Sequence, residues 1–279
     1  MTATEPLCEE LVEAKLKTHV FGQRLVLLQQ AGSTNDVARE LAADGAPEGT
    51  VVVADEQTEG RGRLGRKWVA PPGECLLCSV LFRPNLLVSR TNWLTMLTAL
   101  AMADAVAEVA GLKAELKWPN DLVVPVLADA AGESRWRKLA GVLTETAIVG
   151  DRLAHAIVGI GVNVTVPRGR LNALAPEATS ILAEVGRLVS RVDLLVTFLA
   201  EVERRYTMLQ SGSSPHREWA SRLATLGRRV ETSGPGGLLV GLAEGVDEDG
   251  ALLLRTDDGV QHRLAVGDVT LSRHSSGIR

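Results

Sequence analysis

The chain has 279 residues, of which 46% are hydrophobic and 23% are charged. This length suits one large domain or a domain followed by a small one, and the composition is ordinary for a soluble globular protein. The net charge of −4 argues against a protein that binds nucleic acid over its whole surface, because such binding needs a broad positive potential.

The N-terminus and the cysteines give further exclusions. The first fifteen residues, MTATEPLCEELVEAK, are acidic and lack the basic and apolar regions of a secretory signal. No apolar run reaches the roughly 18 residues that span a bilayer. Three cysteines, Cys8, Cys75 and Cys78, are too few and odd in number for a disulfide framework. Cys75 and Cys78 have C-x-x-C spacing inside an apolar strand-like run, which favours two small core residues. We therefore expect a cytoplasmic protein without a membrane segment.

Strands and a helix are expected in the first third of the chain. Residues 1–20 show a weak helical period and are treated as an N-terminal extension, and residues 24–29 and 50–54 read as strands. Between them, a helix is expected at about 36–43. The three residues before it, Ser33, Thr34 and Asn35, are of types that cap helices, but three exceed what a cap needs. The exposed N–H groups there are candidates to hold a polar ligand group.

The most unusual stretch is 57–68, QTEGRGRLGRKW, which we call the Gly/Arg loop. It carries four positive charges in the nine residues 60–68 and no carboxylate in that run. Glycine lets a backbone approach a ligand closely, and arginine offers a planar fork of donors that matches carboxylates and phosphates. Composition alone leaves three interpretations open: a site for an anionic nucleotide or metabolite, an RGG-like nucleic-acid segment, or a solvated loop. A Walker loop is excluded because no G-x-x-x-x-G-K-[ST] is present.

The middle of the chain predicts a helix between strands. A strand at 75–83 is followed by a long core helix at 91–110, which Gly111 ends, and by a strand at 113–118 that Pro119-Asn120-Asp121 turns. Residues 125–137 are expected to be a surface loop. Residues 139–149 and 152–164 alternate as the arms of a hairpin. In the second arm, Gly159 and Gly161 leave one face without bulk, as if something packs against it.

The sequence pattern changes in the C-terminal part of the chain. Residues 168–187 are expected to be a loop with short helical pieces, and Asp193 is expected to cap a helix that reaches about Gln210. From Arg228, short apolar runs are separated by Gly and Asp-Gly, which predicts a small all-β unit of about 45 residues. We therefore divide the chain into two domains, 1–226 and 227–279.

Six motifs, taken in order, resemble those of the biotin protein ligases. They are Ser33-Thr34-Asn35, Gln57 with GRGRLGRKW at 60–68, KWPND at 117–121, KLAG at 138–141, GIGVNV at 159–164, and Ala178-Thr179-Ser180. Each motif is modest alone, whereas six in this order are highly specific. The resemblance covers residues 20–273. It implies an α+β fold, with a mixed-sheet catalytic domain of the class II synthetase-like biotin/lipoate ligase type and a small SH3-like β-barrel after it.

The resemblance also implies an activity. Biotin protein ligases, the biotin–[acetyl-CoA-carboxylase] ligases, join biotin and ATP to give biotinoyl-5′-AMP and pyrophosphate, and Mg²⁺ assists. They then transfer biotin to a lysine of a biotin carboxyl carrier protein. Many members also carry an N-terminal winged helix that represses transcription. Here the core begins near residue 20, so we expect a ligase without operator binding. Members often pair through sheet edges, which allows a homodimer.

By resemblance, each substrate is assigned a set of residues. Biotin is placed against Ser33, Thr34, Asn35, Gln57, Gly60, Arg61, Gly62, Arg63, Lys138, Gly141, Gly159 and Gly161. ATP is placed against Arg63, Arg66, Trp68, Asn120, Lys138 and Asn163, with Trp68 over the adenine. The catalytic residues are then Arg63, Lys138 and Arg61. Asp121 is a candidate for binding Mg²⁺ or for positioning the amine.

The chemistry agrees with these residue types. A carboxylate must attack a phosphorus that already carries negative charge, so fixed cations are needed where charge develops. Removing one such donor typically costs about 2–4 kcal/mol of barrier. A Gly-rich loop that orders over the adenylate would exclude the water that hydrolyses it.

Two rival interpretations remain. Lipoate protein ligases share the fold and the adenylation chemistry, although the Gly/Arg loop, KWPND and the C-terminal unit favour biotin. A non-enzymatic nucleic-acid or adaptor protein is the other rival. The net charge and the nine aromatic residues argue against it, because stacking platforms need aromatic rings. Lys117 can either end a strand at the surface or contact a ligand.

Overall fold

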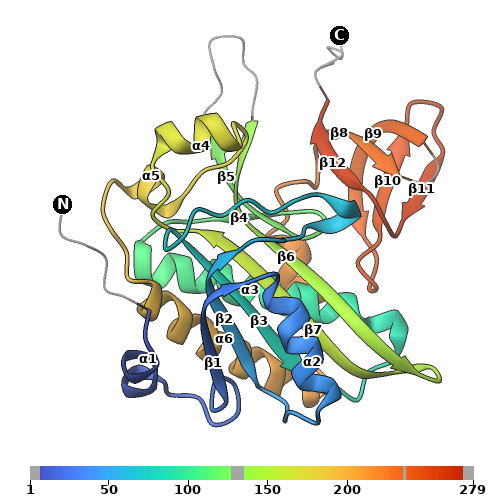
Figure 1. Cartoon of the computed structure of the whole chain (residues 1–279). Coiled ribbons are helices and arrows are strands. Elements are labelled where there is room, and N and C mark those ends of the chain that lie inside the picture. The colour runs from blue at the N-terminus through green and yellow to red at the C-terminus, as the bar shows by residue number, and fades with distance from the viewer. Residues whose placement is uncertain (1–6, 127–134, 235–236, 273–279) are drawn as a thin grey trace.

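The computed structural model describes residues 7–126, 135–234 and 237–272, which build two β-sheets with helices packed on the larger one (Figure 1). The predicted surface loop at 125–137 lies partly outside these ranges. Where it is described, it is strand, since Pro125 and Val126 end β5 (Asp121–Val126) and Arg135–Arg137 begin β6 (Arg135–Val149). The two segments pair with each other, Val126 with Arg135, so their backbone groups are satisfied within the sheet.

The larger sheet has seven strands in the order β1-β2-β3-β7-β6-β5-β4. Its other strands are β1 (Leu25–Ala31), β2 (Val51–Gln57), β3 (Cys75–Phe82), β4 (Glu115–Lys117) and β7 (Arg152–Asn163). β1 and β2 are parallel, and every other neighbouring pair is antiparallel. The mixed sheet and the hairpin turned at Gly150-Asp151 are therefore confirmed.

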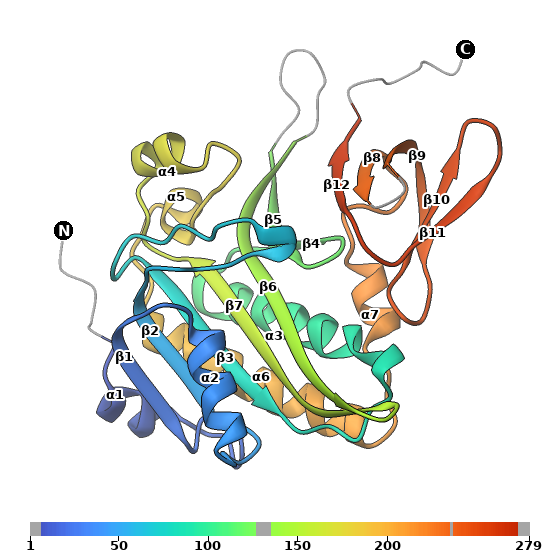
Figure 2. The ribbon, with the colours of Figure 1, turned by 45° about the vertical axis from the view of Figure 1, so that its right-hand side comes forward.

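Helices cover both faces of this sheet. They are α1 (Glu9–Lys15), α2 (Thr34–Ala43), α3 (Asn92–Ala110), α4 (Arg168–Leu174), α5 (Ile181–Val185), α6 (Arg191–Gln210) and α7 (His216–Ser221), with 3₁₀ turns η1 (Arg63–Gly65) and η2 (Val88–Arg90). α3 and α6 lie together behind the sheet, and α2 lies in front (Figure 2). β3 needs this double cover because all eight of its residues are buried.

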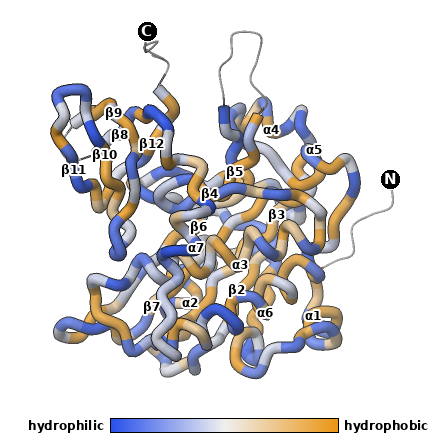
Figure 3. The backbone as a smooth tube through the Cα atoms, turned by 180° about the vertical axis from the view of Figure 1, so that it is seen from behind, coloured by the Kyte–Doolittle hydropathy of each residue, from blue (hydrophilic) through white to orange (hydrophobic). Residues whose placement is uncertain are grey.

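The alternation of strand side chains divides the core. Val51 and Val53 on β2 point into the main core with α3 and α6, whereas Val52 packs with Ala38 and Ala42 of α2. In Figure 3, hydrophobic stretches run through the central strands and α3, and hydrophilic stretches lie in the outer loops.

One helix is more apolar than the expectation of no membrane-length segment allowed for. Val88–Ala110 is long and apolar enough to cross a membrane by composition alone, because its few polar residues do not lower the average hydropathy far. In the structure 72% of its 18-residue window is buried inside the protein. α3 is therefore the core helix that the sequence analysis placed at 91–110, and Gly111 ends it in the left-handed conformation, with φ +69°.

Two helix starts differ from the prediction. Thr34 and Asn35 are the first residues of α2 rather than residues before it, with Ser33 at the N-cap. α6 is capped by Ser190, whose hydroxyl accepts a hydrogen bond from the Asp193 backbone N–H, so Asp193 lies in the first turn. Serine and aspartate both cap well, so residue type alone did not separate them.

The second sheet is antiparallel, in the order β11-β10-β9-β8-β12. Its strands are β8 (Arg229–Gly234), β9 (Gly237–Val246), β10 (Leu252–Thr256), β11 (Gln261–Leu264) and β12 (Asp268–Leu271). The turn before β10 rests on the larger unit: Trp93 Nε1 donates to Glu248 O at 2.8 Å, and Trp118 Nε1 donates to Gly250 O at 2.9 Å. The small all-β unit is confirmed, and the domain boundary near 226 stays a prediction.

Candidate active site

A cavity of about 250 Å³ lies on the α2 face of the larger sheet. Its floor is the centre of the sheet, where Gly161 on β7 pairs with Gly141 on β6, and Gly159 pairs with Leu143. Side chains at these alternate positions point toward α2. Three of these four floor residues are glycine, so the cavity occupies the space that their side chains would fill. This agrees with the prediction that one face of β7 lacks bulk.

The start of α2 closes one end of the cavity with buried polar groups. Thr34 donates to Gln57 Oε1 from its backbone N–H at 2.7 Å and from its hydroxyl at 3.0 Å. The Ser79 hydroxyl on β3 lies 2.8 Å from Thr34 Oγ1 and 2.6 Å from Asn35 Oδ1. A Cβ on Gly159 would lie 2.2 Å from Asn35 Oδ1, so only glycine permits this approach. Ser33 lines the cavity, and its side chain makes no capping hydrogen bond.

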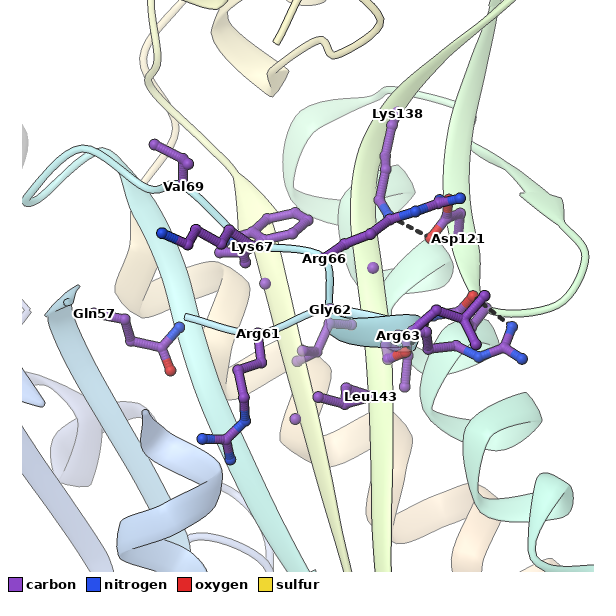
Figure 4. A pocket seen from close by; sticks show the side chains of 18 of the residues that line it. Gln57, Arg61, Gly62, Arg63, Arg66, Lys67, Val69, Asp121, Lys138 and Leu143 are labelled. Carbon is purple, nitrogen blue, oxygen red and sulfur yellow. Dashed lines mark hydrogen bonds and ion pairs between the residues drawn. The ribbon is translucent and has the colours of Figure 1, made fainter. Parts of the chain in front are cut away.

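The Gly/Arg loop crosses the cavity as a small hairpin (Figure 4). Trp68 N donates to Gly60 O at 2.9 Å, and Gly62 N donates to Arg66 O at 2.7 Å. These bonds form a stem, and η1 is the tip. Leu64 in the tip has φ +56°, a backbone conformation that residues other than glycine rarely adopt. Its side chain is also exposed, at 62%.

Arg61 leaves the stem toward α2 rather than toward the other cations. Its guanidinium binds the Asp36 carboxylate through two contacts, of 2.6 and 2.7 Å. In Figure 4, Arg61 points away from Lys138 and Asp121. The pairing raises the pKa of Arg61 and lowers the pKa of Asp36, in each case chiefly through the hydrogen bonds between them.

Arg63 lies deeper and has no carboxylate partner within hydrogen-bond distance among the described residues. Its Nη1 donates to Asn120 Oδ1 at 3.4 Å and to Gly267 O at 3.2 Å. Burial lowers the pKa of Arg63, because the charged form loses hydration. An arginine that is partly desolvated and held only by neutral acceptors is well suited to bind an anion.

Lys138 and Asp121 face each other across the cavity rim. Their Nζ and Oδ1 atoms are 2.6 Å apart. Gly141 leaves room for both, since a Cβ there would lie 3.1 Å from Lys138 Nζ and 3.4 Å from Asp121 Oδ1. Backbone bonds from Lys138 N to Glu177 O and from Thr179 N to Lys138 O, both 2.8 Å, fix the position of this lysine.

Trp68 lies on Gly161 of the cavity floor. A Cβ on Gly161 would lie 2.6 Å from Cε2 of the Trp68 ring, so the indole rests on the bare backbone of β7. Lys138 Nζ is 5.6 Å from the Trp68 ring centroid. The indole Nε1 is buried and has no hydrogen-bond partner within the described ranges.

The second sheet adds a residue that the sequence analysis missed. Asp268, at the start of β12, lines the cavity, binds Arg66 and lies 3.6 Å from Lys117 Nζ. Burial opposes the effect, yet Lys117 and Arg66 together lower the pKa of Asp268. Lys117 is thus engaged by a carboxylate and does not line the cavity.

Nearly all the residues assigned from sequence line this one cavity. The exception is Gly60, where a Cβ would lie 2.5 Å from Trp68 O, so its role is within the loop. Asn163 lines the cavity while its amide donates to Thr179 O at 2.9 Å. Ser79 was missed, although it is the one hydroxyl in the apolar run CLLCSVLF. Asp268 had no comparable signal, because acidic residues are frequent in such β units.

Asp121 is the metal candidate from sequence, and Cys75 and Cys78 are two buried free cysteines. Within the described ranges, no group of three or more His, Cys, Asp or Glu side chains is placed to hold a metal ion. Asp121 is therefore a single carboxylate rather than part of a cage. Burial raises the pKa of both Cys75 and Cys78 to about 12, so neither thiol forms a reactive thiolate readily.

Comparisons with known proteins agree with this geometry. Residues 27–163 match the Biotin/lipoate A/B protein ligase family, and residues 225–272 match the Biotin protein ligase C terminal domain. The chain is 35% identical to the Bifunctional ligase/repressor BirA of Bacillus subtilis, over 91% of this chain and 76% of that protein. It is 32% identical to the Biotin–[acetyl-CoA-carboxylase] ligase of Mycobacterium tuberculosis, over 91% and 93%. The biotin protein ligase of Aquifex aeolicus in complex with biotin and ATP superposes with a TM-score of 0.69 at 29% identity, over 90% of this chain and all of that one.

Proposed function

Because the chain belongs to the biotin protein ligases, we propose that this cavity activates biotin with ATP and passes it to a lysine of a biotin carboxyl carrier protein. The observation that carries the proposal is that three features meet in one cavity: the glycine floor, the buried polar residues at the start of α2, and the cations Arg63 and Lys138. Biotin and ATP are bound together in the Aquifex aeolicus structure.

The cavity gives each part of the adenylate a place. The polar ring of biotin lies against Ser33, Thr34 and Asn35, whose hydroxyl and amide groups can satisfy its donors and acceptors. The adenine lies under Trp68. The junction between the biotin carboxylate and the α-phosphate then falls between the β7 glycines, Gly159 and Gly161, and the pair Arg63 and Lys138.

In the first step, a biotin carboxylate oxygen forms a bond to the α-phosphorus, and the bond to the pyrophosphate oxygen breaks. Arg63 and Lys138 stabilise the charge that develops on the phosphoryl oxygens. Lys138 exchanges its contact with Asp121 for the phosphate. The Gly/Arg loop lies over the reacting atoms and keeps water from the mixed anhydride.

In the second step, the neutral ε-amine of the carrier lysine attacks the acyl carbon. An amide bond forms, the bond from the acyl carbon to the phosphate oxygen breaks, and AMP leaves with the proton that the amine gives up. Asp121, released from Lys138, accepts a hydrogen bond from the amine and so positions it. A single carboxylate there also suits Mg²⁺, which usually takes one or two carboxylates plus substrate phosphates and would neutralise part of the phosphate charge.

The test is to follow both half-reactions with a matched pair of lysine variants. Wild type with biotin, ATP and Mg²⁺ is expected to release pyrophosphate and then to biotinylate a carrier domain. Lys138→Met is expected to lower the rate of the first step by about 10²–10³. Lys113→Met, at an exposed position outside the cavity, serves as the control. Turnover of lipoate in place of biotin would refute the proposed substrate.

The proposal extends to the setting of the reaction. The carrier domain is the protein substrate, and the cytoplasm is the location, since ATP is supplied there. A homodimer and the absence of operator binding stay predictions. Light scattering on the purified chain and a DNA shift assay, respectively, test them.

A further inference from the structure

Arg61 is part of a closed ring of four charges that joins three elements. It binds Asp36 through both Nη atoms, at 2.6 and 2.7 Å. Arg39, one turn further along α2, contacts Asp36 at 2.7 Å and Glu145 of β6 at 2.8 Å. Glu145 lies 3.5 Å from Arg61 and completes the ring. We call Asp36, Arg39, Arg61 and Glu145 the four-charge ring.

The four-charge ring lies at the biotin end of the cavity. Asp36 directly follows Asn35, and Glu145 is two residues beyond Leu143 on the same strand face. The guanidinium of Arg61 already has both of its Nη atoms on one carboxylate. It is therefore poorly placed to hold the biotin carboxylate or the phosphate, which the sequence analysis had assigned to it.

The two strands of the Gly/Arg loop are held by different partners. Arg61, in the stem, is held by the four-charge ring. Arg66, on the returning strand, binds Asp268 of the second sheet, whereas Leu64 and Val69 are 62% and 59% exposed. Gly60, Gly62 and Gly65 make an unanchored loop costly to order, since glycine loses the most conformational freedom.

We propose that Asp36 is a positioning residue: it holds Arg61, and through Arg61 the stem of the Gly/Arg loop, across the biotin end of the cavity. The inference rests on the proposed function and specifies how the site gains affinity for biotin. The contact lowers the entropic cost of holding the stem in the conformation that closes over biotin. ATP binds toward the Trp68 end of the loop, so its affinity does not depend on this contact in the same way.

The experiment compares Asp36→Asn, Arg61→Gln and the double variant with wild type. Asp257→Asn is the matched control, because it removes another carboxylate held by two contacts to one arginine, Arg229, on the second sheet. Biotin affinity and dissociation rate are measured without ATP, and kcat and KM are then measured for each substrate. The thermal midpoint of each variant is recorded.

Asp36→Asn is expected to weaken biotin binding by about three- to tenfold, mainly through faster dissociation. The kcat and the KM for ATP should stay within about twofold of wild type, and the loss should shrink in about 0.5 M salt, which screens exposed charges. The double variant should bind biotin no more weakly than Asp36→Asn, because each single substitution already removes the contact between Asp36 and Arg61. Asp257→Asn should resemble wild type in all these measurements.

Three results would overturn the inference. Unchanged or tighter biotin binding by Asp36→Asn would mean that Asp36 only competes with a ligand for Arg61. Additive losses in the double variant would assign Arg61 to the ligand directly. Equal losses for biotin and ATP with a lower thermal midpoint would indicate a general structural role. Failure of wild type to bind biotin at all would instead overturn the proposed function, and this inference with it.

Discussion

The two floor glycines of β7 allow a prediction in which one substitution, made at two neighbouring positions, separates the two substrates. Gly159 and Gly161 lie on the same face of the same strand, and neither has positive φ. Alanine at either position therefore adds one methyl group without backbone strain. The methyl at 159 meets Asn35, at the biotin end, whereas the methyl at 161 meets Trp68, at the adenine end.

The displacement at position 159 follows from the distances. The new Cβ would lie 2.2 Å from Asn35 Oδ1, so Asn35 must retreat by about 1.2 Å to reach an ordinary contact of 3.4 Å. Asn35 is 3% exposed and its Oδ1 lies 2.6 Å from the Ser79 hydroxyl. A movement of that size breaks this contact. Losing a buried hydrogen bond costs about 1–3 kcal/mol, so biotin affinity should fall by about 5- to 150-fold.

The displacement at position 161 is smaller. The nearest atom is Cε2 of Trp68, at 2.6 Å, so the ring must move by about 0.8 Å. No protein hydrogen bond is lost, because the indole Nε1 has no partner among the described residues. Gly161→Ala should raise the KM for ATP by about tenfold and leave biotin affinity within about twofold.

Calorimetry gives biotin affinity without nucleotide, and a pyrophosphate-release assay gives the KM for ATP. Gly245→Ala on β9 is the control, since the nearest atom to its new Cβ would be 4.0 Å away. Thermal midpoints show whether each variant is folded. Equal effects of the two β7 variants on both substrates, or unchanged biotin affinity in Gly159→Ala, would refute the reasoning.

Three further predictions concern polar contacts. Ser79→Ala should weaken biotin binding by about fivefold with little change in the KM for ATP, because it removes the hydroxyl that fixes the start of α2; calorimetry would show no change if Ser79 were only a core residue. Asp268→Asn should raise the KM for ATP by a few fold, since it frees Arg66 in the stem of the loop, and an effect confined to the KM for biotin would contradict this. Glu203 accepts backbone bonds from residues 19, 20 and 21, and although burial opposes them, these bonds lower its pKa below 4.5. It therefore stabilises the fold above pH 4.5, so Glu203→Gln should lower the unfolding free energy by about 1 kcal/mol at pH 7, and the difference in denaturant melts should vanish as the pH falls through that lowered pKa.

The elements that the sequence predicted best are those whose signals are local. The buried strand at β3, the helix ended by Gly111 and the hairpin turned at Gly150-Asp151 all follow from runs, caps and alternation within a few residues. The element ends were less secure. Thr34 and Asn35 begin α2, and Ser190 rather than Asp193 caps α6, because several residue types can cap a helix equally well.

The sequence by itself determined which residues are special in composition: the glycines of the floor and the loop, the polar residues at the start of α2, and the lysine and arginines. Their order along the chain was enough to indicate the family. Glycine is informative in this way because, wherever the fold places it, it leaves space beside the backbone and permits backbone conformations that other residues avoid.

Only the tertiary structure decided which charges meet. Arg66 and Asp268 are 202 residues apart, and Arg61 and Asp36 are 25 apart, yet each pair is in contact. The chain has 30 Lys and Arg and 34 Asp and Glu, so composition permits very many pairs. A charge acts over a few ångströms in a folded protein, and the partner it finds depends on how distant strands and helices are packed. For this reason the sequence alone pointed Arg61 to the ligand, whereas the fold shows that Arg61 binds Asp36.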